Sequence, residues 1–311
     1  MIRLRAPAKL NLYLRVLGRR PDGYHEIETV FERIDLADEL AFEPRPHELR
    51  LTCSDASAVP AGGGLEGPGL SCGDDNLILK AARVLQRETG TSRGASIHLT
   101  KRIPIAAGLG GGSSDAAAAL VGLNALWELG LGRAELSRVA SALGSDVPFF
   151  LLDAPFALGR GRGDVCEAVP CAGRLAHVLL APAARVATED IYQGSSFTLT
   201  ARRPSSTMVL HALRNGSPSE LATGLWNDLA PEAIRRCPVI SLCQLHLRDE
   251  GCLASCLSGS GPSVFGLCRD APHAQVVAQR LRGRLAQPCR IEIIQTDDPA
   301  RVVTSPVRAG S

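Results

Sequence analysis

The sequence contains few aromatic residues, no surplus of charge and no long apolar run. Aromatic side chains make up 4% of the 311 residues, and 34 basic residues stand against 32 acidic ones, for a net charge of +2. This balance does not suggest a broad basic surface, so we expect no nucleic-acid partner. No apolar run approaches the ~20 residues that a membrane-spanning helix requires, and residues 1–9 lack the apolar core of a signal peptide. We therefore expect a cytoplasmic protein without a membrane partner.

Cysteine and histidine are present but lack the spacing of metal or redox motifs. None of the ten cysteines forms a Cys-x-x-Cys pair, and the seven histidines show no metal-binding interval. Several cysteines, such as Cys252 and Cys268, lie in apolar runs where a thiol packs as a small hydrophobic group. We therefore expect free thiols, and the sequence alone assigns no metal ligand.

The most informative segment is Pro104–Asp115, in which glycine fills four of the five positions from 108 to 112. Glycine lets backbone N–H groups converge on a ligand, and a helix that begins directly after such a loop adds the positive end of its dipole. An alternating segment at 96–101 precedes the loop, and apolar residues at helical spacing follow it from 116 onward. This order of strand, loop and helix is typical of a phosphate-binding site.

Two well-known phosphate motifs do not match this loop. No Lys-Ser or Lys-Thr pair ends it, as a Walker motif requires, and Ser113 stands where a dinucleotide fingerprint has its third glycine. A flexible connection between two core elements is the alternative interpretation.

The length of the chain favours two domains, since domains usually run ~100–200 residues. The composition changes after the basic glycine turn at 159–163, so we expect domains at 1–165 and 166–311. The second domain ends in a predicted strand–strand–helix–strand order over 252–257, 263–268, 272–286 and 291–294. That order is typical of a ferredoxin-like α+β domain.

Local signals in the first domain predict further elements. The first 40 residues alternate as two strands joined by a turn. Residues 54–75, rich in Gly, Pro and Ser, predict a surface loop, and a helix follows with Asp74 or Asp75 as its cap. A second helix is expected at about 134–143, and residues 145–152 predict a short turn that enters a buried strand.

Asp146 and Lys9 are candidates for chemistry. A carboxylate that enters an apolar element needs a partner or its pKa rises, and Lys9, ahead of an apolar strand, is a natural partner. Helix capping by Asp146 and a solvated lysine at a strand end are the alternatives. Ser258–Gly261 is a second small-residue turn that permits close backbone approach to a ligand, although tight hairpins use the same residues.

Segments along nearly the whole chain resemble the 4-diphosphocytidyl-2-C-methyl-D-erythritol kinases, a family in the GHMP kinase superfamily. The Asp22-Gly23-Tyr24-His25 signature separates this family from its sugar and mevalonate relatives. The matching segments cover roughly residues 1–296 and are Pro7–Leu14, Gly18–Glu26, Pro104–Asp115, Gly144–Phe150 and Leu257–Gly261.

The resemblance implies a GHMP kinase fold, with a ribosomal-S5-like N-terminal domain and a ferredoxin-like C-terminal domain around one active site. It implies an ATP-dependent kinase of the methylerythritol phosphate pathway, which phosphorylates the 2-hydroxyl of 4-diphosphocytidyl-2-C-methyl-D-erythritol. The substrate would thus be a small cytidine diphosphate compound, ATP the co-substrate, and Mg²⁺ is expected.

The resemblance also implies roles for individual residues. Asp146 would take the proton from the acceptor hydroxyl, and Lys9 would hold the carboxylate and the hydroxyl in place. Asn11 and His25 would bind the acceptor, and Tyr24 and Tyr192 would flank its cytosine. The residues implied to bind ATP are Asn76, Lys101, Pro104, Ile105, Ala106, Ala107, Gly108, Leu109, Gly110, Gly111, Gly112, Ser113 and Ser114.

Two other functions compete with this one. A different GHMP kinase would act on homoserine, mevalonate or a sugar, and a nucleotide-binding module without catalysis would have lost Asp146 or Lys9, both of which are present. The magnesium ligand stays open between Ser114 and Asp115, because Asp115 could equally stabilise the first turn of its helix. The sequence does not define the oligomeric state.

Overall fold

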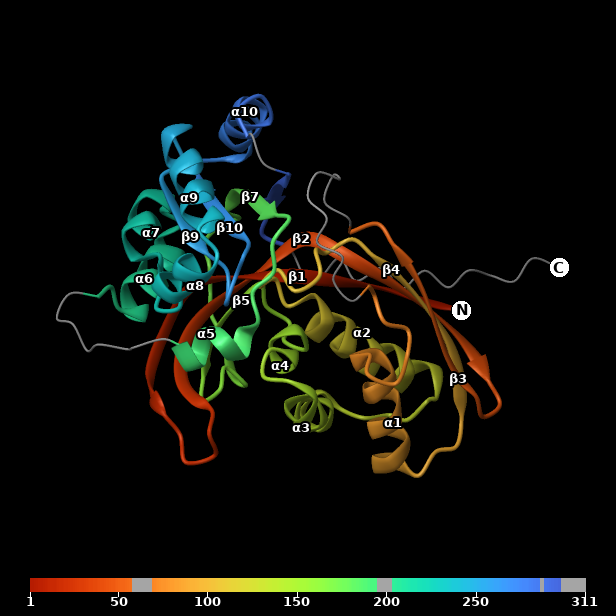
Figure 1. Cartoon of the computed structure of the whole chain (residues 1–311). Coiled ribbons are helices and arrows are strands. Elements are labelled where there is room, and N and C mark those ends of the chain that lie inside the picture. Colours follow the sequence, from red (N-terminus) through yellow and green to blue (C-terminus); the bar gives the residue numbers. More distant parts are fainter. Residues whose placement is uncertain (58–68, 195–202, 286–287, 298–311) are drawn as a thin grey trace.

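The computed structural model describes residues 1–57, 69–194, 203–285 and 288–297. Two β-sheets form the cores of two lobes, and strands β1 (Ile2–Arg19) and β2 (His25–Arg45) run through both (Figure 1). These two strands pair as one long antiparallel hairpin with register shifts between Pro7 and Ala8, Asn11 and Tyr13, and Val16 and Gly18. The predicted pair of strands in the first 40 residues is therefore confirmed.

The larger sheet has the strand order β3-β4-β2-β1-β8, with β5 paired to β2 and β6 to β5. The short β8 lies parallel to β1, although it comes from the second half of the sequence. The other strands of this sheet are β3 (Leu49–Asp55), β4 (Gly94–Lys101), β5 (Phe156–Arg160), β6 (Val165–Ala168) and β8 (Trp226–Asn227).

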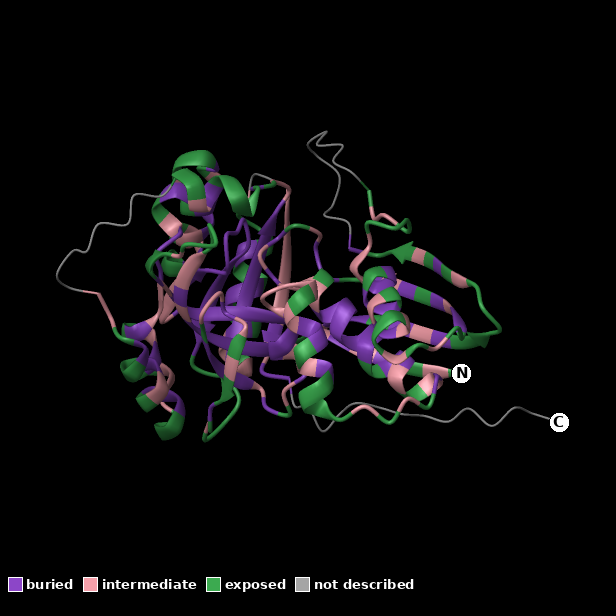
Figure 2. Cartoon of the chain, turned by 90° about the horizontal axis from the view of Figure 1, so that it is seen from below, coloured by how far each residue is buried: buried purple, intermediate pink, exposed green. Residues whose placement is uncertain are grey.

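Helix α2 (Gly111–Leu126) forms the centre of the first lobe, where β1, β2, α1 (Leu77–Thr89), α3 (Arg133–Leu143) and α4 (Val147–Phe150) surround it. Its alanine run lets these neighbours approach closely, and its first three turns are mostly buried. Gly122 faces the ring of Phe42, which leaves no room for a side chain. In Figure 2 the buried residues gather in the central strands and helix.

The smaller sheet is antiparallel, with the order β11-β7-β10-β9, and α9 (Val239–Asp249) and α10 (Ala271–Arg282) pack on it. In this sheet β7, the first strand in chain order, lies between β11 and β10. This is the ferredoxin-like arrangement that the order of strands and helices predicts. The strands are β7 (Ala176–Pro182), β9 (Ala254–Leu257), β10 (Val264–Cys268) and β11 (Cys289–Gln295). The remaining helices are α5 (Thr188–Gly194), α6 (Ser206–Asn215), α7 (Pro218–Gly224) and α8 (Ala230–Arg236).

Two local predictions were wrong. Residues 147–150 form a helix and not a strand, because Pro148 fits the first turn of a helix, where its missing N–H has no intrahelical partner. The cap of α1 is Asn76 and neither Asp74 nor Asp75, since the Asn76 side chain accepts a hydrogen bond from the Ile78 amide.

The expectation of free thiols was wrong for one pair of cysteines. Cys53 on β3 and Cys72 ahead of α1 form a disulfide, with their Cα atoms 6.3 Å apart, because α1 packs beside β3. The other eight cysteines are free. Most of the glycine-rich segment 60–73 lies outside the described residues. In the described part of the chain, no helix combines the length and apolarity needed to cross a membrane.

Gly122→Ala is expected to destabilise the protein, although Ala normally favours a helix by about 0.5–1 kcal/mol over Gly. The new Cβ would come within 2.6 Å of the Phe42 ring, and overpacking of this kind usually destabilises by about 1–3 kcal/mol. Thermal unfolding measures the change. The neighbouring half-exposed Val121→Ala is the control and should change little; a higher Tm for the Gly122 variant would contradict the packing.

Candidate active site

A cleft of about 690 Å³ lies where the two lobes meet. The phosphate-loop residues 104–113 form one wall, and side chains of both lobes complete it. The predicted site residues that line the cleft are Lys9, Asn11, Asn76, Lys101, Asp146 and Tyr192, whereas Tyr24, His25 and Ser114 are not among the lining residues. The structure therefore gathers most of the predicted site in one place.

The glycines of the loop are required by what surrounds them. A Cβ on Gly108 would lie 2.1 Å from the Ser258 carbonyl oxygen, and one on Gly110 would lie 2.9 Å from Cγ of Lys9. Both glycines also have positive φ, +77° and +69°, which side chains other than glycine adopt reluctantly. The loop ends at the N-terminus of α2, so the positive end of a buried helix faces the cleft.

Lys9 lies in the middle of β1 and is almost fully buried. Its Nζ donates to Oδ1 of Asn11 at 2.5 Å and lies 3.5 Å from Oδ2 of Asp146, while its backbone amide donates to the Leu109 carbonyl. Burial lowers the pKa of Lys9, and the Asp146 carboxylate opposes that effect. Asn11 is itself oriented by the Thr29 hydroxyl, to which its amide donates.

This geometry rejects both alternative interpretations of the pair. Asp146 occupies the N-cap position of α4, yet its side chain makes no capping hydrogen bond. It remains partly exposed, at 28% of its side chain, and faces the cleft. Lys9, with 4% of its side chain exposed, is not a solvated lysine at a strand end.

A second buried charge cluster lies at the start of α2. Nζ of Lys101 donates to Asp38 at 2.5 Å and to Asp115 at 2.6 Å. The other oxygen of Asp38 accepts from the backbone amides of Arg102 and Ile103, which lead into the loop. Burial raises the pKa of Asp115 to about 7 despite the nearby ammonium. Burial would lower the pKa of Lys101, but the two carboxylates outweigh it and raise the value.

Aromatic side chains adjoin the part of the cleft wall that Tyr192 and Arg162 form. The rings of His25 and Tyr192 stack with their centroids 5.0 Å apart. Tyr24 is 57% exposed, and the Arg162 guanidinium lies 5.0 Å from its ring centroid. Burial and the Asp146 carboxylate both raise the pKa of the Tyr192 phenol. The flanking of cytosine by the two tyrosines stays a prediction, and Tyr192 is the one in the cleft wall.

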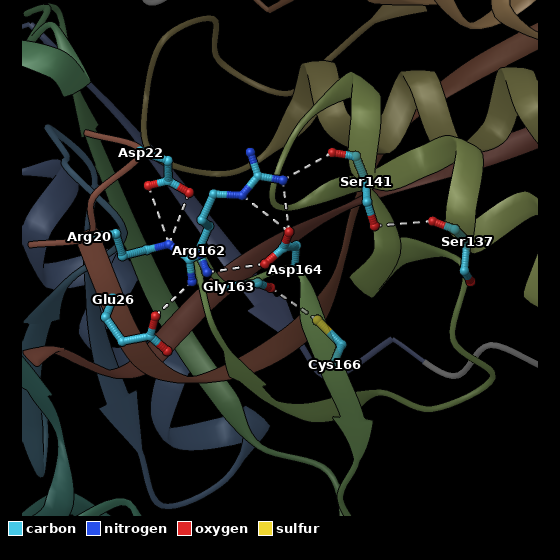
Figure 3. Close-up of polar contacts among 9 residues, drawn as sticks. All are labelled: Arg20, Asp22, Glu26, Ser137, Ser141, Arg162, Gly163, Asp164 and Cys166. Atoms are coloured by element: carbon cyan, nitrogen blue, oxygen red, sulfur yellow. Dashed lines mark hydrogen bonds and ion pairs between the residues drawn. The ribbon is translucent and has the colours of Figure 1, made fainter. Parts of the chain in front are cut away.

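Arg162 is fixed between the tip of the β1–β2 hairpin and α3 (Figure 3). It donates to Asp164 at 2.8 Å and to the Ser141 carbonyl at 3.2 Å. At the hairpin tip, Arg20 pairs with Asp22 and Glu26. These contacts order the turn that carries the Asp-Gly-Tyr-His signature.

The sequence analysis did not assign a role to three residues that shape the site. Asp38 pairs with Lys101, 63 positions away. The one local indication of its role is that a carboxylate stands within an apolar strand. Asn227 donates to the Leu257 and Gly259 carbonyls and thus holds the second small-residue turn. Arg162 lies in the basic glycine turn, and its place in the cleft wall depends on contacts with distant elements.

The chain matches two family models, the GHMP kinases N terminal domain over residues 76–154 and the GHMP kinases C terminal over residues 209–287. It is 41% identical over 278 residues to 4-diphosphocytidyl-2-C-methyl-D-erythritol kinase of Pelotomaculum thermopropionicum, covering 89% of this chain and 92% of the relative. It is 45% identical over 295 residues to the enzyme of the same name from Synechococcus sp. strain CC9605, covering 88% of this chain and 91% of the relative.

Solved structures agree with these matches. A crystal structure of 4-(cytidine 5'-diphospho)-2C-methyl-D-erythritol kinase is similar with a TM-score of 0.76 and 35% identity, covering 94% of this chain and 99% of that one. A homoserine kinase from Cytophaga hutchinsonii shares the fold alone, with a TM-score of 0.73 at 19% identity and coverage of 96% of this chain and 94% of that one.

The fold, the glycine loop at the start of α2 and the family models define the chain as a GHMP kinase. Within that class it belongs to the 4-diphosphocytidyl-2-C-methyl-D-erythritol kinases, ATP-dependent enzymes of isoprenoid precursor synthesis.

Gly110→Val is expected to abolish ATP binding without unfolding the protein. The added atoms would meet the Lys9 side chain and Cζ of Phe150, and the positive φ strains a β-branched residue. The valine would therefore displace side chains that pack against the loop, in addition to filling space that the phosphates need. Calorimetric titration with ATP measures the loss, and circular dichroism checks the fold.

Gly173→Val is the matched control for this variant. Gly173 does not line the cleft, and a Cβ there would meet no other atom within 4 Å, so ATP binding should persist. Normal ATP affinity in the Gly110 variant would show that the loop is only a connector.

Proposed function

We propose that this kinase transfers the γ-phosphoryl group of ATP to the 2-hydroxyl of 4-diphosphocytidyl-2-C-methyl-D-erythritol, with Asp146 as the proton acceptor. The observation that carries the proposal is the Lys9–Asp146 pair at the edge of the glycine loop. Phosphoryl transfer depends on positioning and charge stabilisation more than on covalent chemistry. A carboxylate, a buried cation and a helix N-terminus in one cleft meet that requirement.

Asp146 accepts the proton of the acceptor hydroxyl as the oxygen attacks phosphorus. Its partly exposed carboxylate faces the cleft and is free of a capping bond. Lys9 holds the carboxylate and the hydroxyl together, and its own place is set by Asn11. The backbone of the loop and the start of α2 receive the phosphates. Lys101 lies close to this backbone, because its Nζ is 2.9 Å from the position that a Cβ on Gly111 would take.

The start of α2 also fits a magnesium ion. Oδ1 of Asp115 and Oγ of Ser114 are buried without a hydrogen-bond partner, and Mg²⁺ prefers oxygen ligands, usually one or two carboxylates together with substrate phosphates. We propose that these two residues hold the ion. When bound, Mg²⁺ neutralises charge on the β- and γ-phosphates.

The acceptor's cytidine end would occupy the part of the cleft that Tyr192 lines. The stacked rings of His25 and Tyr192 offer a flat apolar face, and the imidazole offers a donor or an acceptor to a base edge. Asn11 lies toward the reacting end, beside Lys9. Tyr24, at the hairpin tip, would cover the outer side.

Acceptor assays with labelled ATP test the substrate directly. Incubation with 4-diphosphocytidyl-2-C-methyl-D-erythritol, mevalonate, homoserine and a sugar should label the first compound alone, and phosphorus NMR of the product should place the new phosphate on the 2-hydroxyl. Labelling of mevalonate or homoserine, with none of the cytidyl compound, would overturn the proposal. ATP binding without any transfer would indicate a non-catalytic module.

Asp146→Asn is expected to lower kcat by ~10²–10⁴-fold, the usual contribution of a positioned general base, while ATP still binds. Lys9→Ala should act in the same direction, because it removes the group that holds Asp146. Steady-state kinetics and ATP titration measure both effects. The control is Asp153→Asn, an exposed acid just beyond α4 whose partner Arg133 is also exposed; near-normal turnover in both cleft variants would refute the assigned roles.

Tyr192→Ala is expected to weaken binding of the cytidyl substrate by about 10- to 150-fold, from a base–aromatic stacking contribution of ~1–3 kcal/mol. ATP affinity should hardly change. Tyr192→Phe keeps the ring and should bind normally. Tyr24→Ala should act in the same direction as Tyr192→Ala. Equal losses for both substrates, measured by titration of each ligand, would mean that these rings serve the fold and not the cytosine.

A further inference from the structure

Arg33 on β2 is a buried cation that the reaction described above does not use. Only 4% of the residue is exposed; in the described parts of the chain its carboxylate neighbours, Asp297 and Asp153, act on it through charge alone and do not form a salt bridge with it. A charge held in the interior without a direct salt bridge is costly, so such a group needs other strong contacts. Its contacts lead directly to the catalytic pair.

The first set of contacts is to the end of α4. Nη2 of Arg33 donates to the carbonyl oxygens of Phe150 at 3.1 Å and Leu152 at 2.9 Å. These carbonyls lie at and just beyond the last residue of the helix, where they lack intrahelical partners and where a cation is favourable. Asp146 is the N-cap of the same four-residue helix. A helix this short has little stability of its own, so the direction of Asp146 depends on what holds α4.

The second set of contacts is a column of rings and cations. The Arg33 guanidinium lies 5.8 Å from the ring centroid of Phe149, Phe149 stacks on Phe31 at 4.8 Å, and Nζ of Lys9 lies 5.7 Å from the Phe31 centroid. Both cations are within the ~6 Å at which a ring face attracts a positive charge. Phe31 and Arg33 are two positions apart on β2 and so share a side of the strand.

The column is held rigidly at its centre. Phe31 and Phe149 are almost completely buried. A Cβ on Gly159 would come within 2.8 Å of the Phe31 ring, so the backbone of β5 lies directly against it. Displacement of either ring would therefore shift both the Lys9 side chain and α4.

We propose that Arg33 is a positioning residue for the Lys9–Asp146 pair, acting through the end of α4 and through the Phe149–Phe31 column. The proposal rests on the catalytic roles proposed above for Lys9 and Asp146. Arg33 is absent from the lining of the cleft, so we expect it to contact neither ATP nor the acceptor. Its loss should affect the chemical step and leave nucleotide binding intact.

Arg33→Met tests this, because methionine fills much of the space but has neither charge nor N–H donors. We expect kcat to fall by about 10- to 100-fold, the scale of a small misplacement of reacting groups, with ATP affinity by titration unchanged. Arg33→Lys keeps a cation and a donor and should restore most of the loss. A purely structural role would lower the Tm but leave kcat of the folded protein, measured well below the Tm, at the original value.

Arg133→Met is the matched control. Arg133 contacts the turn after α4 from outside, through an exposed ion pair with Asp153 at 3.3 Å, and such pairs contribute little. If the Arg33→Met protein does not fold, Arg33→Gln, which keeps a donor without the charge, should still show a lower kcat than Arg33→Lys. Full kcat in a folded Met or Gln variant overturns the proposal. Because Asp146→Asn is assayed beside it, that outcome differs from failure of the catalytic assignment, in which Asp146→Asn itself stays active.

Discussion

Three hydrogen bonds to consecutive carbonyls of the glycine loop hold the two lobes and the first strand together. Ala107 accepts from the Ser263 amide, Gly108 from the Ser258 hydroxyl and Leu109 from the Lys9 amide. Glycine-rich backbone has high conformational freedom, and here two separate segments, β1 and the turn between β9 and β10, remove that freedom. The positions of Lys9, the second small-residue turn and the N-terminus of α2 are thereby linked through one short stretch of main chain.

The sequence predicted best those parts of the molecule that depend on the pattern of neighbouring residues. The glycine spacing at 108–112 and the alternation along β1 express backbone and burial requirements within a few residues, and both were found as expected. The pairing of Lys9 with Asp146 came from two short motifs and a family resemblance, and the structure places their side chains 3.5 Å apart.

The parts that the sequence did not predict depend on tertiary contacts. The partners of Asp38 and Arg33 lie 63 and more than a hundred positions away, and no periodicity encodes such distances. An apolar run such as residues 147–150 suits a buried strand as well as a buried helix, so the apolar pattern alone could not decide between them. The Cys53–Cys72 disulfide depends on the packing of α1 beside β3, which the cysteine spacing does not reveal.

The pairing of β8 with β1 has a consequence for the order of events during synthesis. The Asp228 carboxylate accepts from the Val16 amide, 212 positions away, and Trp226 and Asn227 lie beside Tyr13 and Leu14. N-terminal segments leave the ribosome first. The edge of β1 at Tyr13 and Leu14 therefore has no β8 partner until most of the chain has been synthesised. Unpaired edges invite association with other chains. Strand β1, which carries Lys9, therefore gains its β8 partner only when the second lobe has been made. A nascent or truncated chain that ends before residue 226 contains the glycine loop but lacks the strand that pairs with this edge of β1.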